Sequence, residues 1–62
     1  MNNYEVSFVS ASERVEYVLA DSFEFDHTSY LVRFLIDDKV IFAIPIGRLV
    51  SIRIIMEPVN HV

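Results

Sequence analysis

The sequence predicts a small all-β domain over residues 1–62, an antiparallel meander of five short strands curled into an open barrel. Three observations lead to this prediction. Apolar and polar residues alternate in several short runs, as in half-buried strands. Residues 40–56 are rich in β-branched side chains, which favour a pleated sheet over a helix. Polar turn residues separate the runs, and 53% hydrophobic against 23% charged residues is the composition of a folded domain.

The first half of the chain is predicted to be extended. Residues 4–8 alternate in polarity and form the first strand, and residues 11–26 form one long, bent strand. Its inward side chains are Val15, Tyr17, Leu19, Phe23 and Phe25, and its outward ones are Glu16, Glu24 and Asp26. The alternative is an α+β fold with a short helix at residues 11–21, because the apolar residues there also have helical spacing. The aromatic residues favour the strand.

The second half predicts three more strands. Residues 26–29 form a turn by composition, and a strand follows over residues 30–36. The Asp37–Asp38 pair makes a tight hairpin into the next strand, which Pro45 ends because proline donates no hydrogen bond to a ladder. A short turn follows, with Gly47 expected at positive φ. The last strand spans residues 49–56, before Pro58.

Alternation divides the apolar residues of these three strands between two faces. The predicted inward side chains are Val32, Phe34, Ile36, Val40, Phe42, Ile44, Ile46, Val50, Ile52, Ile54 and Met56. The predicted outward side chains are Leu31, Leu35, Ile41, Ala43 and Ile55. A small isolated sheet needs one wet face, so an apolar outward set implies that something covers it. We therefore expect these outward residues to form an oligomer interface.

Chain length leads to the same expectation. A domain of about 60 residues buries only ~60% of its unfolded surface, and small domains are usually stabilised by disulfides, a metal or oligomerisation. The sequence contains no cysteine, which excludes disulfides and the common thiolate zinc sites. We expect a homo-oligomer with no cofactor and no metal.

Location and partner class follow from charge and hydropathy. No secretory signal is visible at Met1, so we expect a cytoplasmic protein. The apolar segment 40–56 carries Pro45, Gly47 and Arg48 at its centre, and a central arginine costs about 2.5–3.5 kcal/mol on membrane insertion, so no membrane span is expected. A net charge of -4 argues against non-specific binding to phosphate backbones, which makes nucleic acid an unexpected partner.

The strand, one-turn connection and strand from Phe42 to Arg53 resemble the closing element of SH3-like and Sm-like barrels. The layout of the whole chain is also similar to short uncharacterised bacterial and phage β-barrel proteins. The resemblance implies an open SH3-like or Sm-like barrel and, for the Sm-like kind, a ring-forming RNA binder. Sm-like proteins usually carry a glycine in the second strand and an RNA-contact motif near the turn between the fourth and fifth strands. Neither is present here, so no residue is assigned an RNA-binding role.

Four residues are candidates for contacts with a partner. Arg48 is the first, because it is a charged residue on a turn between two apolar strands; the interpretation favoured against this role is a hydrogen bond to local carbonyls or to one of the early acids. Arg33 and Arg53 are candidates for a small basic patch with Tyr30, since interfaces favour arginine and tyrosine. The interpretation favoured over this patch is cross-strand pairing of Arg33 and Arg53 with Glu16 or Glu24, because acidic residues dominate the first 26 positions.

Catalytic and phosphate-binding motifs are missing from the sequence, which has no cysteine nucleophile and no glycine-rich loop. Asp26 beside His27 is interpreted as a solvated turn, the Asp37–Asp38 pair as a polar hairpin tip and His61 as a terminal residue. The predicted function is therefore a non-catalytic, self-associating protein-interaction module, a small bacterial or phage regulator. The alternative is a ring-forming Sm-like RNA-binding protein. An enzyme, whose site would have to be assembled across subunits, is the least favoured class.

Overall fold

The structure, a computed structural model that describes residues 1–55, contains six strands and one 3-10 helix in that range. The elements are β1 (Asn2–Ser10), β2 (Ser12–Ala20), β3 (Ser22–Asp26), β4 (Leu31–Ile36), β5 (Lys39–Pro45), η1 (Ile46–Arg48) and β6 (Leu49–Ile55). The predicted all-β class is confirmed. Because β2 occupies residues 12–20, the alternative of a helix at residues 11–21 is wrong.

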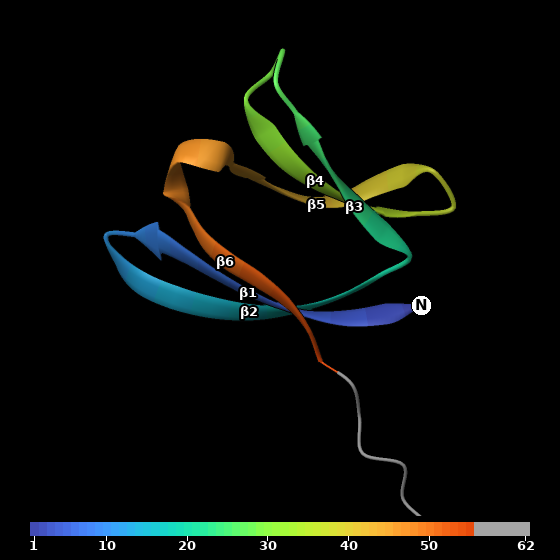
Figure 1. Ribbon diagram of the computed structural model, residues 1–62, viewed down its shortest axis with the longest axis horizontal. Helices are drawn as coiled ribbons and strands as arrows, with labels where there is room; N and C mark the ends of the chain where they lie inside the picture. The colour runs from blue at the N-terminus through green and yellow to red at the C-terminus, as the bar shows by residue number, and fades with distance from the viewer. Residues whose placement is uncertain (56–62) are drawn as a thin grey trace, which may run out of the picture.

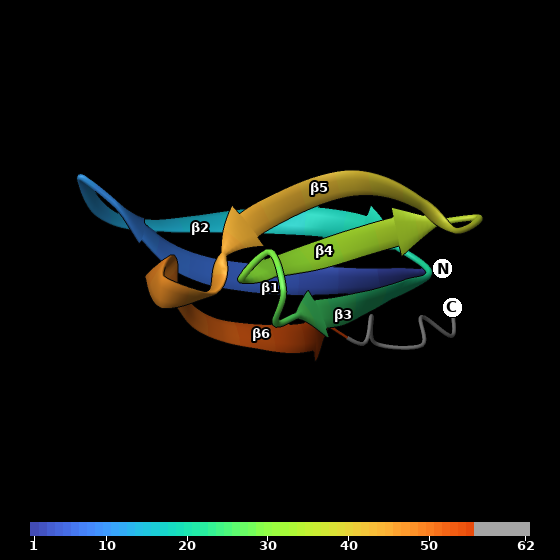
Figure 2. The same cartoon turned by 90° about the horizontal axis from the view of Figure 1, so that it is seen from above.

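The strands form two three-stranded antiparallel sheets (Figure 1). The first sheet has the order β2-β1-β6 and the second has the order β3-β4-β5. Only the second sheet is a meander of consecutive strands, because β6 crosses back through η1 to pair with β1. Seen from above, the second sheet lies over the first, with β5 and β2 at one side and β3 and β6 at the other (Figure 2).

The predicted long strand over residues 11–26 is divided at Asp21 into β2 and β3, which belong to different sheets. The Asp21 amide donates a hydrogen bond to the Leu35 carbonyl at 2.8 Å, so the chain joins the second sheet at this residue. The Asp21 carboxylate accepts a hydrogen bond from the Asp37 amide at 3.0 Å, which ties the corner to the β4–β5 hairpin. Both bonds join Asp21 to residues at least 14 positions away in sequence, so tertiary contacts divide the strand here.

The core lies between the two sheets. Its buried residues among the described positions are Tyr4, Val6, Val18 and Ala20 from the first sheet and Val32, Phe34 and Ile44 from the second. The ring centroids of Tyr4 and Phe34 lie 5.5 Å apart, and those of Tyr4 and Phe23 lie 5.4 Å apart in an edge-to-face arrangement. Such geometry adds about 0.5–1.5 kcal/mol per pair to the burial of the rings. Aromatic contacts therefore join the two layers.

Turn conformations confirm one prediction and correct another. Asp37 and Asp38 connect β4 to β5 with φ values of 51° and 63°, as a tight two-residue hairpin requires. Gly47 was expected at positive φ, and this is wrong: no glycine in the described part has positive φ, and Gly47 lies inside η1. The left-handed positions belong to non-glycine residues instead, including Ala11 between β1 and β2 and Tyr30 before β4.

Two bulges change the predicted facing of β5 and β6. The β4–β5 ladder shifts register between Phe34 and Leu35, so Val40 pairs with Leu35 and is exposed rather than inward. The β1–β6 ladder shifts beside Ser7 and Phe8, and the exposed Val50 is the extra residue there. Ile54 pairs with Tyr4 but is also exposed, because β6 is a sheet edge. The inward prediction is confirmed for the remaining described residues of the set, which are Val32, Phe34, Ile36, Phe42, Ile44, Ile46 and Ile52.

The predicted facing of residues 12–20 is reversed. Val18 and Ala20 enter the core, whereas Val15, Tyr17 and Leu19, predicted inward, are exposed on the outer face of the first sheet. Phe25, predicted inward on β3, is also half exposed because β3 is an edge strand, while Phe23 contacts the core.

No helix among the described residues is both long and apolar enough to cross a membrane. The predictions made for Met56, Pro58 and His61 fall outside the described residues.

Candidate interaction surfaces

Four of the five predicted interface residues lie together on the outer face of the second sheet. Leu31 and Leu35 come from β4, and Ile41 and Ala43 come from β5. Val32 and Phe34 of β4 are fully buried in the core, so their neighbours in sequence face outward. The exposed Val40 joins this group. We call the outer surface formed by Leu31, Leu35, Val40, Ile41 and Ala43 the β4–β5 face.

A bulge concentrates apolar surface at one end of this face. Val40 pairs with Leu35, and Ile41 is the extra residue between this pair and the Phe34–Phe42 pair, since the register shifts there by one residue. Val40 is 49% exposed and Ile41 is 47% exposed, which is unusual for two consecutive aliphatic residues of a strand. The predicted outward side chains are thus joined by Val40, which was predicted to face the core.

Ile55, the fifth predicted interface residue, does not belong to the β4–β5 face. It lies on β6 and pairs with Asn3 in the first sheet. Its neighbour Ile54 pairs with the buried Tyr4, so Ile55 faces outward on the opposite side of the two-layer structure.

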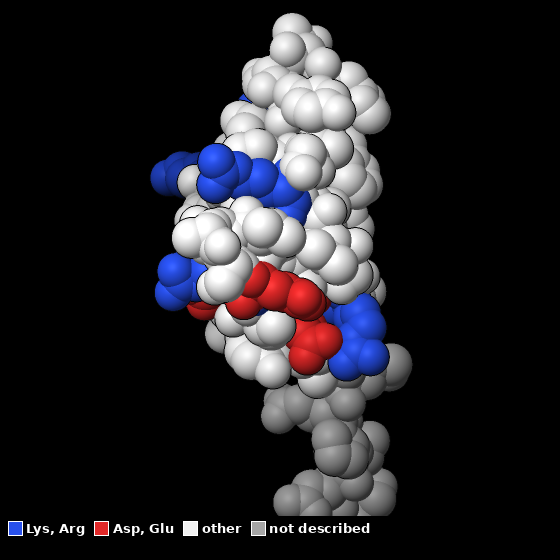
Figure 3. All heavy atoms as spheres, turned by 90° about the vertical axis from the view of Figure 1, so that its left-hand side faces the viewer, with Lys and Arg blue, Asp and Glu red and all other residues white. Residues whose placement is uncertain are grey.

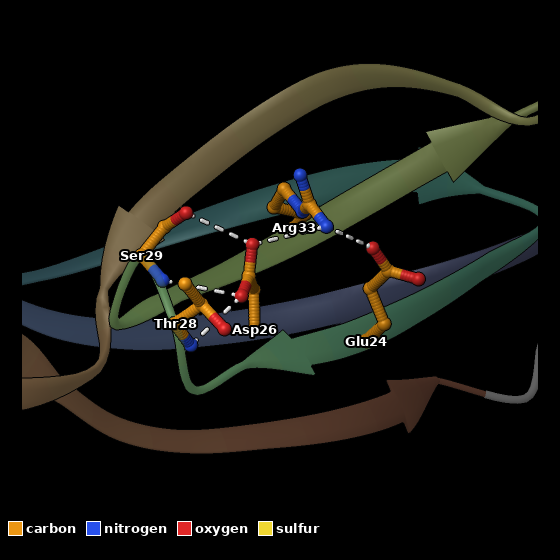
Figure 4. Close-up of polar contacts among 5 residues, drawn as sticks. All are labelled: Glu24, Asp26, Thr28, Ser29 and Arg33. Carbon is orange, nitrogen blue, oxygen red and sulfur yellow. Dashed lines mark hydrogen bonds and ion pairs between the residues drawn. The ribbon is translucent and has the colours of Figure 1, made fainter.

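Arg33 lies on the outer face of the second sheet and is held by two carboxylates. Its Nη2 atom is 2.6 Å from Glu24 Oε2 and 3.2 Å from Asp26 Oδ2 (Figure 4). The pairing with Glu24 is the alternative that the sequence suggested for this arginine, and it follows from the β3–β4 register, in which the two residues are direct partners. The Arg33 Nε atom is buried and has no hydrogen-bond partner among the described residues. The two carboxylates at Nη2 leave Arg33 little free charge for a partner.

Asp26 organises the β3–β4 turn. Its Oδ1 atom accepts hydrogen bonds from the amides of Thr28 at 2.9 Å and Ser29 at 3.1 Å, and its Oδ2 atom accepts one from the Ser29 hydroxyl at 2.9 Å (Figure 4). These bonds to Ser29, with smaller contributions from the Thr28 amide and the Arg33 charge, lower the pKa of Asp26. His27 stacks on Phe25 at 6.4 Å between ring centroids. The carboxylate thus holds the turn, as the solvated-turn interpretation expected.

Arg53 is separated from Arg33. Its Nε and Nη2 atoms lie 2.9 and 2.8 Å from Glu5 Oε1 on the outer face of the first sheet. The expected partners Glu16 and Glu24 are not the ones used, because β6 pairs with β1 and Arg53 lies directly opposite Glu5. Arg33 and Arg53 thus lie on different layers and do not form the predicted basic patch. Figure 3 shows the end of the molecule that carries η1 and the β1–β2 hairpin, where acidic side chains lie between basic ones.

Tyr30 and Arg48, the other predicted contact residues, come near each other at η1. The Ile46 amide donates a hydrogen bond to the Tyr30 carbonyl at 3.0 Å. The Tyr30 ring lies over Gly47, since a Cβ at that glycine would be 3.8 Å from Tyr30 Cε2. Arg48 is the next residue and is exposed in the last turn of η1. Tyr30 has a φ of 61°, which is unusual for a bulky side chain and fixes its direction beside η1.

A second exposed surface was missed by sequence analysis. It is strand β2, where residues 12–17 are exposed at every position and Val15, Tyr17 and Leu19 point outward. Apolar residues occupy both parities over residues 15–20, so alternation alone could not decide which set enters the core. The charges Glu13, Arg14 and Glu16 were the available signal that this strand is open to solvent.

Comparison of the chain with protein-family models, curated proteins and solved structures gives no match. The resemblance in strand layout to SH3-like and Sm-like barrels therefore stays a prediction. Within residues 1–55, no group of three or more histidine, cysteine or carboxylate side chains is placed to hold a metal ion.

Proposed function

We propose that the protein is a non-catalytic protein-interaction module that associates with further copies of itself through the β4–β5 face. The observation that carries the proposal is the five apolar side chains on the outer, solvent-facing side of a two-layer β structure. An outer face of this kind is normally polar in an isolated antiparallel sheet. Clustered exposed apolar surface on a small domain marks an interaction site. Here the cluster surrounds Arg33, which pairs with Ala43 in the ladder and is bound by Glu24 and Asp26.

The small core supports self-association in particular. The fully buried side chains of the described part are few, with Phe34, Val6 and Val32 the largest of them. A domain of this size gains only about 3–5 kcal/mol from its own core. Covering the β4–β5 face with a second copy buries further apolar surface, at about 25 cal/mol per Å². Arg33 does not oppose this contact, because two carboxylates already neutralise it.

The experiment is a comparison of two aspartate variants. Ile41→Asp introduces a charge into the β4–β5 face, and Val50→Asp introduces the same charge at a similarly exposed aliphatic position of β6 in the other sheet. We expect Ile41→Asp to have a smaller mass than the wild type by light scattering while it keeps a β-sheet circular dichroism spectrum. Val50→Asp is expected to keep the wild-type mass. An Ile41→Asp variant with the wild-type mass would contradict the proposal.

The alternative remains the ring-forming RNA binder with an open Sm-like barrel, in which repetition around a ring concentrates charge. Less supports it, because Arg33 and Arg53 are each paired with acids and lie on different layers. Arg48 is the arginine that this alternative depends on. Salt-dependent binding of single-stranded RNA that Arg48→Ala weakens would favour the alternative.

A further inference from the structure

We propose that β2 pairs antiparallel with β2 of a second copy of the chain, so that the first sheets of two copies join into one continuous sheet. This interface goes beyond the proposed function, because β2 is an edge of the first sheet and the β4–β5 face is the outer surface of the second. Either surface can fail its test without the other.

Strand β2 is the least protected edge of the described structure. Edges are normally made unsuitable for pairing by shortness, bulges, proline or charged side chains, and of these β2 has only the charges, which a second copy of β2 can neutralise. The edge strand β3 has five residues, β5 contains a bulge and ends at Pro45, and β6 contains a bulge. Strand β2 has nine residues, contains neither proline nor glycine, and pairs with β1 over its whole length without a register shift. Its free edge is therefore a regular template for another strand.

Access to this edge is open over its first six residues. Arg14 and Glu16 pair with Phe8 and Val6 of β1, so they lie on the inner face of the first sheet, yet both are exposed. The second sheet covers β2 only near Val18 and Ala20. A strand of a second copy can thus lie beside residues 12–17 without displacing the core.

The charges of β2 match a second copy of β2. In an antiparallel pair centred on Val15, Arg14 lies opposite the partner's Glu16, and Glu16 lies opposite the partner's Arg14. Glu13 lies opposite the partner's Tyr17, whose hydroxyl already donates a hydrogen bond to Glu5 of its own chain at 3.4 Å, so this position adds no ion pair and no charge repulsion. Val15 lies opposite the partner's Val15, an apolar pair. Direct cross-strand pairs of opposite charge and of β-branched residues stabilise antiparallel sheets. Within residues 1–55, neither Arg14 nor Glu16 forms an ion pair inside its own chain.

Other registers of the β2–β2 pair can also place the inner faces of the two first sheets on the same side, but they are disfavoured. Centring the pair on Arg14 places that arginine opposite the partner's Arg14, and centring it on Glu16 places two glutamates opposite each other. Like charges directly opposite each other are destabilising. Centring on Tyr17 leaves Glu16 opposite the partner's Val18, without a counter-charge. The sequence of the strand thus selects one register and a two-fold, self-complementary contact.

A charge exchange tests the proposal in an Ile41→Asp background, in which the β4–β5 face is disabled. We expect Ile41→Asp itself to form a dimer. Adding Arg14→Glu or Glu16→Arg places two like-charge pairs across the β2 edge and is expected to raise the dissociation constant by about tenfold or more. The two variants mixed together restore both opposite-charge pairs and are expected to form a heterodimer. The double exchange Arg14→Glu and Glu16→Arg is expected to dimerise like the parent. A monomeric parent, or a mixture that associates no better than its components, would overturn the proposal.

A cysteine cross-link tests the register. The chain has no cysteine, so Val15→Cys supplies a single thiol. Directly opposite residues of an antiparallel pair have Cα atoms about 4.5–5.5 Å apart, within the range for a disulfide. Mild oxidation is expected to link Val15→Cys into a covalent dimer much faster than the control Val50→Cys, a slightly more exposed position on β6. Equal cross-linking of both variants, or faster cross-linking of Tyr17→Cys, would rule out the register centred on Val15.

Discussion

Gly47 does not adopt the positive φ for which glycine is usually needed. As the only glycine of the chain it was expected to provide a positive φ, but it lies in the short helix η1 under the ring of Tyr30. The positive φ values are carried by Ala11, Tyr30 and the two aspartates of the β4–β5 hairpin. Aspartate accepts this conformation more easily than most residues, which explains the hairpin, whereas tertiary contacts impose it on Tyr30.

Gly47→Ala is predicted to stabilise the protein. The position does not need a positive φ, and the added Cβ would meet Tyr30 Cε2 at 3.8 Å, an ordinary van der Waals contact. The substitution reduces the conformational entropy of the unfolded chain, which raises the free energy of unfolding by about 0.4–1 kcal/mol. Urea denaturation followed by circular dichroism measures this. A lower stability of Gly47→Ala would contradict this prediction.

Asp26 makes the stability of the protein sensitive to acid. Its folded pKa lies below its ordinary value of 3.8, chiefly through the hydrogen bonds from Ser29, so folding favours the ionised carboxylate. This contribution is complete above pH 3.8 and is lost as the pH falls through the lower folded pKa. We expect the difference in unfolding free energy between the wild type and Asp26→Asn to shrink on acidification over that range. In a Ser29→Ala background, which lacks one donor to Asp26, the effect of Asp26→Asn on the unfolding free energy should be smaller already at neutral pH. An effect of Asp26→Asn that does not change with pH would contradict this role of the Asp26 carboxylate.

At the scale of elements, local patterns predicted the second sheet well. Alternation placed Val32 and Phe34 in the core, and the Asp37–Asp38 pair correctly marked the hairpin that follows. The bulges beside Leu35 and Val50 were not predictable, because a bulge adds one residue to a ladder whose partner strand is unknown from sequence. For the same reason Val40 and Val50 were assigned to the wrong face.

Strand β2 was predicted as a strand but with its faces exchanged. Its residues 15–20 are apolar on both faces apart from Glu16, so both facings satisfy alternation. The corner at Asp21 decides between them, since its hydrogen bond to Leu35 brings the end of β2 beneath the second sheet with Val18 and Ala20 inward. This contact joins residues far apart in sequence and leaves no local signal.

Matched valine substitutions on this one strand test its facing. Val18 is 7% exposed and Val15 is 47% exposed. Val18→Ala is predicted to lower the free energy of unfolding by about 1.5–3 kcal/mol, because it removes buried methyl groups and leaves a cavity. Val15→Ala is predicted to change it by no more than about 0.5 kcal/mol, as an exposed substitution does. Denaturation at a protein concentration low enough to exclude association compares the two variants. A larger loss of stability in Val15→Ala than in Val18→Ala would support the facing predicted from the sequence instead.

The molecule as a whole carries apolar surface on the outside of both layers. The second sheet carries the β4–β5 face, and the first sheet carries the outward side chains of β2. The sequence identified most of the first surface through Leu31, Leu35, Ile41 and Ala43. Ile55 also points outward as predicted, but the pairing of β6 with β1 puts it on the other layer.

The candidate polar contacts were harder to predict than the apolar ones. Whether an arginine is free or paired depends on which strand lies beside it, and that is a property of sheet order. Arg33 forms an ion pair with Glu24, one of its two expected partners, because β3 and β4 are consecutive, paired strands. Arg53 met Glu5, which lies 48 positions away in sequence, because β6 returns to β1.

We propose that the chain covers its outer apolar surface by self-association, and the molar mass in solution tests this proposal. Sedimentation equilibrium or light scattering of the wild-type protein at micromolar concentration is predicted to give a molar mass of two or more times the 7.2 kDa chain mass. The Ile41→Asp variant is predicted to give a smaller molar mass than the wild type. A wild-type protein that is folded by circular dichroism and has the mass of a single chain at that concentration would contradict self-association.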